Sequence, residues 1–262
     1  MNLSIIIPIY NSEKIIPILT NKIKKILKKK IKKFELILIN DHSIDRSWLT
    51  IKKICKKNSF IRGINLLKNY GQHNAITAGL KYSRGKYLIL MDDDLQHDPK
   101  YIPNILEQLL RGYDACYVRY LKRKHSFWKK FVSKLNHITS SYLANKTSKI
   151  YTSSFKGFNK RIKNKIVNDK HKEVFLDWII LDNSTKVKSI EIIHKKRLIG
   201  KTNYNLKKLL ILWSNMIIRI KTNNKFKKIL IFLIKIFIVS TINKIINKKT
   251  FREKFIILEK TF

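Results

Sequence analysis

The chain has little cysteine: Cys55 and Cys116 are the only two among 262 residues. They lie far apart, each inside a segment with the pattern of regular secondary structure. This excludes a disulfide framework and a cysteine-based zinc site, and it indicates reduced thiols in a cytosolic protein. The first residues also lack a basic leader, and their apolar run stops at Pro8. We therefore expect no signal peptide.

Two common nucleotide-binding motifs are missing as well. No G-x-G-x-x-G follows the first apolar segment, and no Walker-A sequence occurs anywhere in the chain. Their absence disfavours NAD-dependent enzymes and P-loop NTPases.

Acidic residues are scarce, with 17 Asp and Glu against 57 Lys and Arg, which gives a formal charge of +40. Such a charge favours anionic partners: nucleic acid, an acidic membrane face or phosphorylated substrates. Because lysine, isoleucine and asparagine are abundant along the whole chain, a general composition bias explains part of it. Phe127 and Trp128 among lysines leave a nucleic-acid-binding module as one alternative.

Three consecutive acids follow one apolar run. Residues 87–91 carry no polar break and are followed by Asp92, Asp93 and Asp94. Such a run is typical of a buried strand in a parallel sheet, and ligands bind beyond the carboxyl ends of these strands. Neighbouring carboxylates repel unless a cation lies between them, and their oxygens suit Mg²⁺ or Mn²⁺. Asp92 and Asp94 are thus candidate metal ligands. The alternative is a solvated acidic turn in which Asp98 caps a helix starting at Pro99.

Strand and helix patterns alternate through the first half of the chain. We expect strands at 3–7, 34–39, 61–67, 87–91 and 114–118. The pattern predicts an α/β fold with a mostly parallel sheet flanked by helices. It also brings together the polar residues that follow four strands, at 8–12, 40–43, 68–73 and 92–96. They would line one rim of the sheet. The carboxylates of Asp92 to Asp94 would repel a nucleic-acid phosphate at this rim, which argues against the nucleic-acid alternative.

The second half is less regular. Strands are expected at 151–158 and 187–194, followed by a cationic stretch around Gly200 that suits an anion-binding loop or a charged connection. Residues 206–220 form an amphipathic pattern, and the apolar stretch 226–246 is broken by Lys235. A membrane span needs about 20 apolar residues, so helices lying in the membrane surface fit better, with core or oligomer helices as the alternative. We predict a catalytic domain at 1–204 and amphipathic helices at 205–262.

Several motifs, in order, resemble the inverting family-2 glycosyltransferases of the GT-A fold. Within that family the chain is most similar to enzymes that move a sugar onto a polyprenyl or dolichyl phosphate. The similarity is carried by Pro8-x-Tyr10-Asn11, by Asp41 with its neighbours, by Lys68 to Leu80, by Asp92 to Gln96, by Ser154 to Phe158 and by His194 to Tyr204. It runs from about residue 3 to 220.

The resemblance implies roles for individual residues. Pro8, Tyr10, Asn11, Asp41, Asp92 and Asp93 would bind the donor nucleotide. Asp92 and Asp94 would hold Mg²⁺ or Mn²⁺ on its diphosphate, and these two with Arg197 would be catalytic. Gln72, Gln96, Arg197 and Lys201 would contact phosphates of the donor or the acceptor. The metal would neutralise the departing nucleoside diphosphate.

Four positions depart from the family pattern. Ser12 stands where Glu is usual, although Glu13 follows it; Asn40 and His42 replace an Asp and a Gly. Ile150 stands where the lipid-phosphate subgroup carries an Asp, so the usual candidate base is missing. An alcohol must lose its proton to attack, whereas a phosphate monoester, with a second pKa near ~6, is already mostly ionised at neutral pH. The missing base at position 150 therefore favours a lipid-phosphate acceptor.

These observations predict a metal-dependent inverting glycosyltransferase at the cytoplasmic face of the plasma membrane. It would use a nucleotide sugar, UDP-linked, and a polyprenyl phosphate, on an anionic membrane surface and without nucleic acid. The nearest alternative is the same fold acting on a glycan hydroxyl, with Asp177 or Glu173 as its base. The sequence leaves open the sugar, the nucleotide, whether 226–246 spans the membrane, and whether the chain forms a homo-oligomer.

Overall fold

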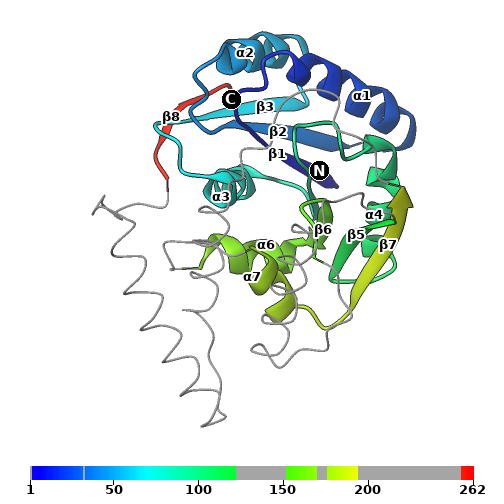
Figure 1. Cartoon of the computed structure of the whole chain (residues 1–262). Coiled ribbons are helices and arrows are strands. Elements are labelled where there is room, and N and C mark those ends of the chain that lie inside the picture. The colour runs from blue at the N-terminus through cyan, green and yellow to red at the C-terminus, as the bar shows by residue number, and fades with distance from the viewer. Residues whose placement is uncertain (1, 32, 122–151, 170–175, 194–254) are drawn as a thin grey trace, which may run out of the picture. The chain divides into compact units, whose positions relative to one another are not determined.

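The computed structural model describes residues 2–31, 33–121, 152–169, 176–193 and 255–262. Within them an eight-stranded sheet has the order β7-β5-β6-β4-β1-β2-β3-β8 (Figure 1). The strands are β1 (Leu3–Ile9), β2 (Phe34–Asn40), β3 (Ile61–Leu66), β4 (Tyr87–Leu90), β5 (Ala115–Leu121), β6 (Lys156–Asn159), β7 (Val187–Ile193) and β8 (Ile257–Lys260). The expected α/β fold is confirmed.

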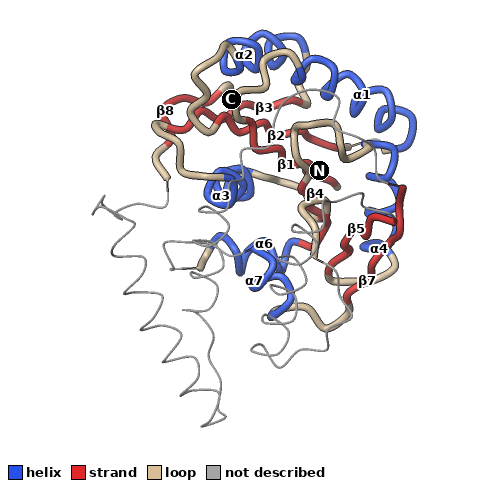
Figure 2. Tube along the Cα trace, in the orientation of Figure 1, coloured by secondary structure: helices blue, strands red, loops and turns tan. Residues whose placement is uncertain are grey.

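Helices cover both faces of this sheet (Figure 2). One face carries α1 (Ile15–Lys30), α2 (Ser47–Lys57) and α4 (Ile102–Leu110), the last preceded by a 3₁₀ turn at Pro99–Tyr101. The other face carries α3 (Gln72–Tyr82), α6 (Lys160–Val167) and α7 (Leu176–Asp182). Successive residues of a strand point to opposite faces, so strands buried on both sides read as unbroken apolar runs.

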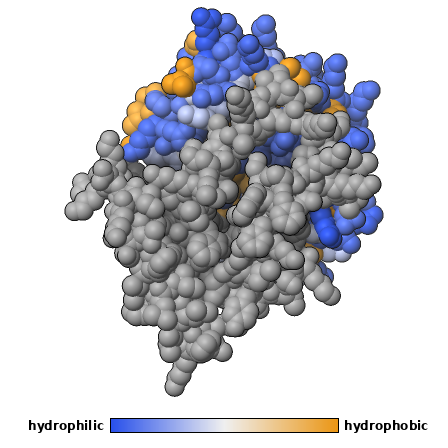
Figure 3. Space-filling model, viewed as in Figure 1, coloured by the Kyte–Doolittle hydropathy of each residue, from blue (hydrophilic) through white to orange (hydrophobic). Residues whose placement is uncertain are grey.

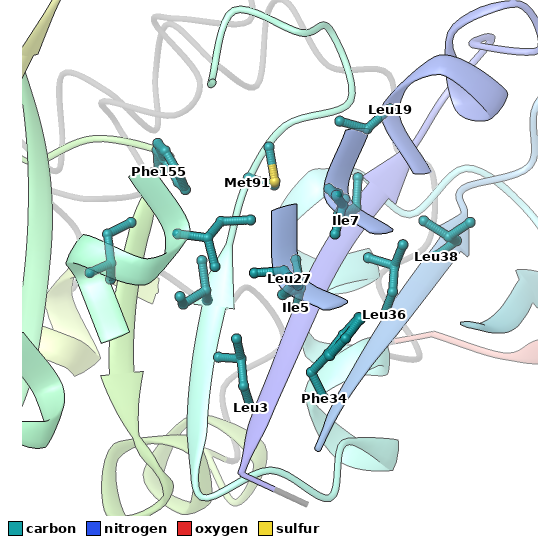
Figure 4. Packing of buried hydrophobic residues seen from close by; sticks show 14 of the residues in the cluster. Leu3, Ile5, Ile7, Leu19, Leu27, Phe34, Leu36, Leu38, Met91 and Phe155 are labelled. Carbon is teal, nitrogen blue, oxygen red and sulfur yellow. The ribbon is translucent and has the colours of Figure 1, made fainter. Parts of the chain in front are cut away.

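Strand β1 shows this division of side chains. Ile5 and Ile7 pack with Leu19 and Leu27 of α1 (Figure 4). Ile6 belongs to the cluster on the opposite face, under α3. There α3 approaches the sheet closely, because a Cβ added at Gly79 would lie 2.7 Å from the Ile6 side chain. A larger residue at this position would push α3 away from the sheet.

The central strands are parallel, β1 with β2 and β4, and β2 with β3. The sequence prediction that Pro8 ends the first strand is wrong, because β1 continues to Ile9. Pro8 pairs with Ile39 of β2, while the pairing of β1 with β4 stops at Ile6. The carbonyl of Ile6 accepts from Met91 on the β4 side, and Pro8 faces that same side beyond the last paired residue. Its missing N–H therefore costs no ladder hydrogen bond.

Two strands were not anticipated in their observed form. β6 is shorter than the predicted 151–158 strand and runs antiparallel between β4 and β5. β8 lies inside the stretch that the sequence assigned to amphipathic helices, yet it pairs antiparallel with β3. Thr261 extends this contact, because its hydroxyl accepts from the Gly63 N–H at 2.8 Å. The last residues thus cover the β3 edge of the sheet.

A buried ion pair ties β2 to β3. Arg62 donates to the Glu35 carboxylate at 2.8 Å, and both side chains are at most 9% exposed. Ser4 donates to the same carboxylate at 2.6 Å, as does the backbone N–H of Arg84 at 2.6 Å. The Arg62 guanidinium also lies 3.7 Å from the centre of the Phe262 ring. The charge of Glu35 is therefore compensated from three sides, as a buried carboxylate requires.

Asp114 joins the starts of β5 and β7 to the end of β6. Its carboxylate accepts from Asn159, from Arg161 and from the backbone N–H groups of Thr185 and Lys186. Burial raises the pKa of Asp114, but these hydrogen bonds outweigh it and bring the pKa well below the usual range. These hydrogen bonds favour the ionised carboxylate.

The surface seen in Figure 3 is largely hydrophilic where the described residues form it. Among the described residues, no helix is long and apolar enough to cross a membrane. The predicted amphipathic helices at 206–220 and 226–246 lie outside the described residues. They remain expectations, as does a domain boundary near residue 204.

Candidate functional site

The carboxyl ends of β1, β2 and β4 meet at one rim, as the sequence predicted. Three residues other than glycine adopt a positive φ in the described part of the chain: Asn11 at 54°, His42 at 57° and Leu95 at 60°. One follows each of these strands. A branched side chain such as Leu95 rarely adopts this conformation, and the surrounding structure must hold it there. The rim is where the fold stores backbone strain.

Hydrogen bonds join the β1 and β2 ends of the rim. The Asn11 side chain accepts from the Ile44 N–H at 3.0 Å, and its own N–H donates to Ser43 at 3.0 Å. Asp41, at the end of β2, accepts from the N–H groups of Tyr70 and Gly71 at 2.7 and 2.9 Å. Burial raises the pKa of Asp41, although both bonds favour its ionised form. Asp41 thus fixes the loop that leads into α3.

Asp93 joins β4 to the loop after β1. Its carboxylate accepts from the Ser12 hydroxyl at 2.5 Å and from the Tyr10 N–H at 3.3 Å. The pKa of Asp93 is raised to about 6, chiefly by burial and also by the neighbouring Asp92 and Asp94, against the lowering effect of these hydrogen bonds. Ser12 therefore has a clear task at the position where the family pattern has Glu. Tyr10 itself is 38% exposed at the rim.

Asp92 is clamped from two sides. Gln72, the first residue of α3, donates to one carboxylate oxygen at 2.7 Å, and Ser154 donates to the other at 2.7 Å. His97 accepts from the Asp92 N–H through Nδ1 at 3.1 Å, and its Nε2 lies 3.3 Å from the Ser154 hydroxyl. The His97 ring stacks on Phe155 with centroids 5.1 Å apart. Three separate segments of the chain orient this one carboxylate.

Asp94 takes part in the turn itself. One of its carboxylate oxygens accepts from the Gln96 N–H at 3.0 Å, and the residue is 9% exposed. Asp98 accepts from the Lys100 N–H, so the expected cap of the following helix is also present. The acidic turn and the candidate site are thus the same structure.

The donor set fits a divalent ion only in part. Within the described ranges, no group of three His, Cys, Asp or Glu residues could hold a metal by itself. Mg²⁺ bound with nucleotides usually takes one or two carboxylates and completes its shell with phosphate oxygens and water. Among the described residues, no Lys or Arg forms an ion pair with Asp92 or Asp93, and the imidazole Nε2 of His97 lies 3.8 Å from Asp92. Hard, negatively charged oxygens that no lysine neutralises suit such an ion.

The structure brings together most residues that the sequence singled out. Asp92, Asp93, Asp94, Gln72 and Gln96 meet at the end of β4, and Pro8, Tyr10, Asn11 and Asp41 lie at the neighbouring strand ends. Gln72 contacts Asp92. Arg197, Lys201 and Glu173 lie outside the described residues. Sequence reasoning missed the roles of Ser154, which stands inside a quoted motif, and of His97, which directly follows one.

Comparison with known proteins agrees with this geometry. Residues 4–167 match the family model for glycosyl transferase family 2. An uncharacterised glycosyltransferase of Bacillus subtilis, YkcC, is 29% identical over 208 residues, which is 79% of this chain and 64% of the relative. An undecaprenyl-phosphate 4-deoxy-4-formamido-L-arabinose transferase of Pectobacterium atrosepticum is 29% identical over 217 residues, 82% of this chain and 66% of the relative. The chain thus spans slightly less than two thirds of these relatives.

Solved structures share the fold. Glucosyl-3-phosphoglycerate synthase of Mycobacterium tuberculosis, in complex with Mn²⁺ and UDP-glucose, has a TM-score of 0.62 at 15% identity, covering 86% of this chain and 80% of that one. The TarS 1–349 fragment of S. aureus has a TM-score of 0.53 at 16% identity, covering 94% and 73%. At such low identity the likeness concerns the fold alone.

Proposed function

The chain belongs to glycosyl transferase family 2, and from this premise we propose that it transfers a sugar from a nucleotide sugar to a polyprenyl phosphate, with inversion at the sugar carbon. The observation that carries the proposal is the carboxylate cluster at the tip of β4, bonded to the loops after β1 and before α3. The relative from Pectobacterium atrosepticum acts, by its name, on undecaprenyl phosphate.

The rim supplies the donor side of the reaction. Asp41 would receive the base or ribose with Pro8, Tyr10 and Asn11, which lie on the adjoining strand end. Tyr10 is exposed enough to stack on a base. Asp93 holds this loop against β4, so the nucleotide and the sugar are positioned by one connected structure. Such fixed positioning contributes to catalysis by bringing the reacting atoms together in one orientation.

Asp94 and Asp92 would hold a divalent cation, which neutralises charge on the departing nucleoside diphosphate. A structural relative was crystallised with Mn²⁺ and UDP-glucose, and this supports Mn²⁺ or Mg²⁺ and a UDP-linked donor. The clamp on Asp92 fixes the direction of its carboxylate before substrate arrives. Preorganised groups of this kind need no rearrangement during the reaction.

The acceptor side favours a phosphate over a hydroxyl. Ile150 takes the place of the family's candidate base, and a phosphate monoester needs no base because it is mostly ionised at neutral pH. The acceptor lipid lies in a membrane, so we also propose that the protein works at the cytoplasmic face of the plasma membrane. The amphipathic pattern of 206–246 supports attachment to its surface.

The test is product analysis. The full chain is incubated with mixed nucleotide sugars, Mn²⁺ and undecaprenyl phosphate, and the lipid fraction is analysed by mass spectrometry for a glycosylated undecaprenyl phosphate. Undecaprenol replaces the phosphate in the control. A sugar adduct of undecaprenyl phosphate supports the proposal. Transfer to a glycan hydroxyl with no lipid product would refute it in favour of the alternative acceptor.

A second measurement tests the metal role. Asp94→Ala should abolish Mn²⁺-dependent binding of UDP, measured by calorimetry, while Asp98→Ala, four residues away, serves as the matched control. Unchanged UDP binding and undiminished sugar transfer by Asp94→Ala would show that this carboxylate does not hold the ion.

A further inference from the structure

A buried lysine lies next to the carboxylate cluster. Lys156, the first residue of β6, pairs with Leu90 at the end of β4, and its side chain is 5% exposed. Its ammonium group contacts the carboxylate of Asp177 on α7, whose side chain is 36% exposed. The hydroxyl of Tyr117 donates to the same Asp177 oxygen at 3.0 Å. A charge this deeply buried requires a partner, and Asp177 supplies it.

The pair adjoins the proposed donor site through two connections. Ser154, two residues before Lys156, donates to Asp92 at 2.7 Å. The imidazole of His73, on the first turn of α3, interacts electrostatically with Lys156, Asp177 and Asp92. The pKa of His73 is lowered to about 4, chiefly by burial and also by Lys156. His73 is therefore neutral at physiological pH, and the ammonium is the positive charge of this group.

From this placement we propose that Lys156 binds the phosphate of the acceptor, and that Asp177 holds the ammonium in place until the acceptor arrives. The inference rests on the proposed function, since it assigns the phosphate-binding cation of that reaction. The partly exposed Asp177 carboxylate is the anion that an incoming phosphate would replace. Exchange of one anion for another leaves the buried ammonium paired throughout.

The same geometry argues against Asp177 as a base for a hydroxyl acceptor. One of its oxygens already accepts from both Lys156 and Tyr117. A general base needs an oxygen directed at the proton that it removes. The Oδ1 atom of Asp177 is instead engaged with donors from β5 and β6, and we assign Asp177 the role of positioning the cation.

The experiment measures lipid binding by the full chain without turnover. Neutral phosphatidylcholine nanodiscs carry undecaprenyl phosphate, undecaprenol or, as a control for general charge attraction, phosphatidic acid. Three substitutions are compared with the wild type: Lys156→Met, Lys156→Arg and Asp177→Asn. Lys163→Met is the matched control, because Lys163 is also a buried lysine but donates to the carbonyl of Ser83.

Lys156→Met should weaken binding to undecaprenyl phosphate by about 10- to 100-fold, the effect of losing one charge-assisted hydrogen bond. Binding to the undecaprenol discs should not change. Lys156→Arg should retain most of the affinity, and Asp177→Asn should tighten binding, because it removes the competing carboxylate. Lys163→Met should behave as the wild type. Circular dichroism establishes that each variant is folded.

Two results would overturn the inference while leaving the proposed function intact. One is a wild-type preference for undecaprenyl phosphate that Lys156→Met retains. The other is an Asp177→Asn variant that binds the lipid but no longer transfers sugar, because this result would identify Asp177 as the base. If the wild type does not distinguish undecaprenyl phosphate from undecaprenol and phosphatidic acid, the proposed acceptor itself is wrong. If Lys156→Met does not fold, the tighter binding expected for Asp177→Asn and the retained affinity expected for Lys156→Arg decide the question.

Discussion

Removing either clamp of Asp92 should impair donor binding without unfolding the protein. Gln72 and Ser154 each donate to one carboxylate oxygen at 2.7 Å. A hydrogen bond to a charged group contributes about 1.5–3 kcal/mol. Because the Asp92 side chain is 27% exposed and water can replace a lost donor, we take the lower limit. Each 1.4 kcal/mol corresponds to about a tenfold change.

We therefore expect Ser154→Ala and Gln72→Ala each to lower kcat/KM for the nucleotide sugar by about tenfold. The two donors fix the same carboxylate, so their effects should not be additive in the double variant. Ser154→Thr, which keeps a hydroxyl, should recover part of the loss. Ser184→Ala is the matched control, because its hydroxyl donates to a carbonyl within α7.

The assays are Mn²⁺-dependent UDP binding by calorimetry, steady-state sugar transfer and thermal unfolding. The melting temperatures of the variants should stay near that of the wild type. The reasoning would be refuted if Ser154→Ala bound UDP and turned over as the wild type does, or if its loss of activity followed a loss of folded protein.

Three further outcomes are expected. Glu35→Ala leaves Arg62 buried without its carboxylate partner, so the free energy of unfolding, from urea titration, should fall by about 3–5 kcal/mol. Asp114 has a lowered pKa in the folded state, so its contribution to stability is present above the ordinary pKa of 3.8 and is lost as the pH falls below that value. Asp114→Asn should therefore flatten the pH dependence of the free energy of unfolding, measured with urea, in that acidic range. An unchanged slope would contradict this. The full chain should float with anionic liposomes at low salt but not at high salt. A variant without 205–251 should stay at the bottom of the gradient. Equal flotation of the full chain and this variant would contradict the predicted role of that stretch.

Much of the fold could be predicted because its central strands are buried on both faces. The mainly apolar segments at 3–7, 34–39 and 87–91 have the length of strands and are too short for buried helices. β8 could not be predicted in the same way. Its outward residues are exposed, and its register depends on Gly63 and Thr261, which lie far apart in the sequence. Contacts of this kind leave no periodic pattern in either segment.

The site was predictable to the same degree and for a similar reason. Acids at a strand end pointed to the rim, and parallel topology then brought the neighbouring strand ends together. Which donors would hold Asp92 was not readable, because Ser154 reaches it from a segment 62 positions away. Lys156 stands inside the quoted motif from Ser154 to Phe158, but in a chain with 57 Lys and Arg the sequence does not distinguish a buried ammonium from a surface one.

The return of the chain to the β3 edge has a practical consequence. Residues 122–151 lie between β5 and β6 in the sequence, and residues 194–254 lie between β7 and β8. Each stretch is thus bounded on both sides by strands of the same sheet. An affinity tag fused after Phe262 would begin beside Arg62 and Tyr82, whose side chains contact the Phe262 ring, and would probe the sheet edge. A label intended to report on residues 122–151 or 194–254 must be placed within those stretches.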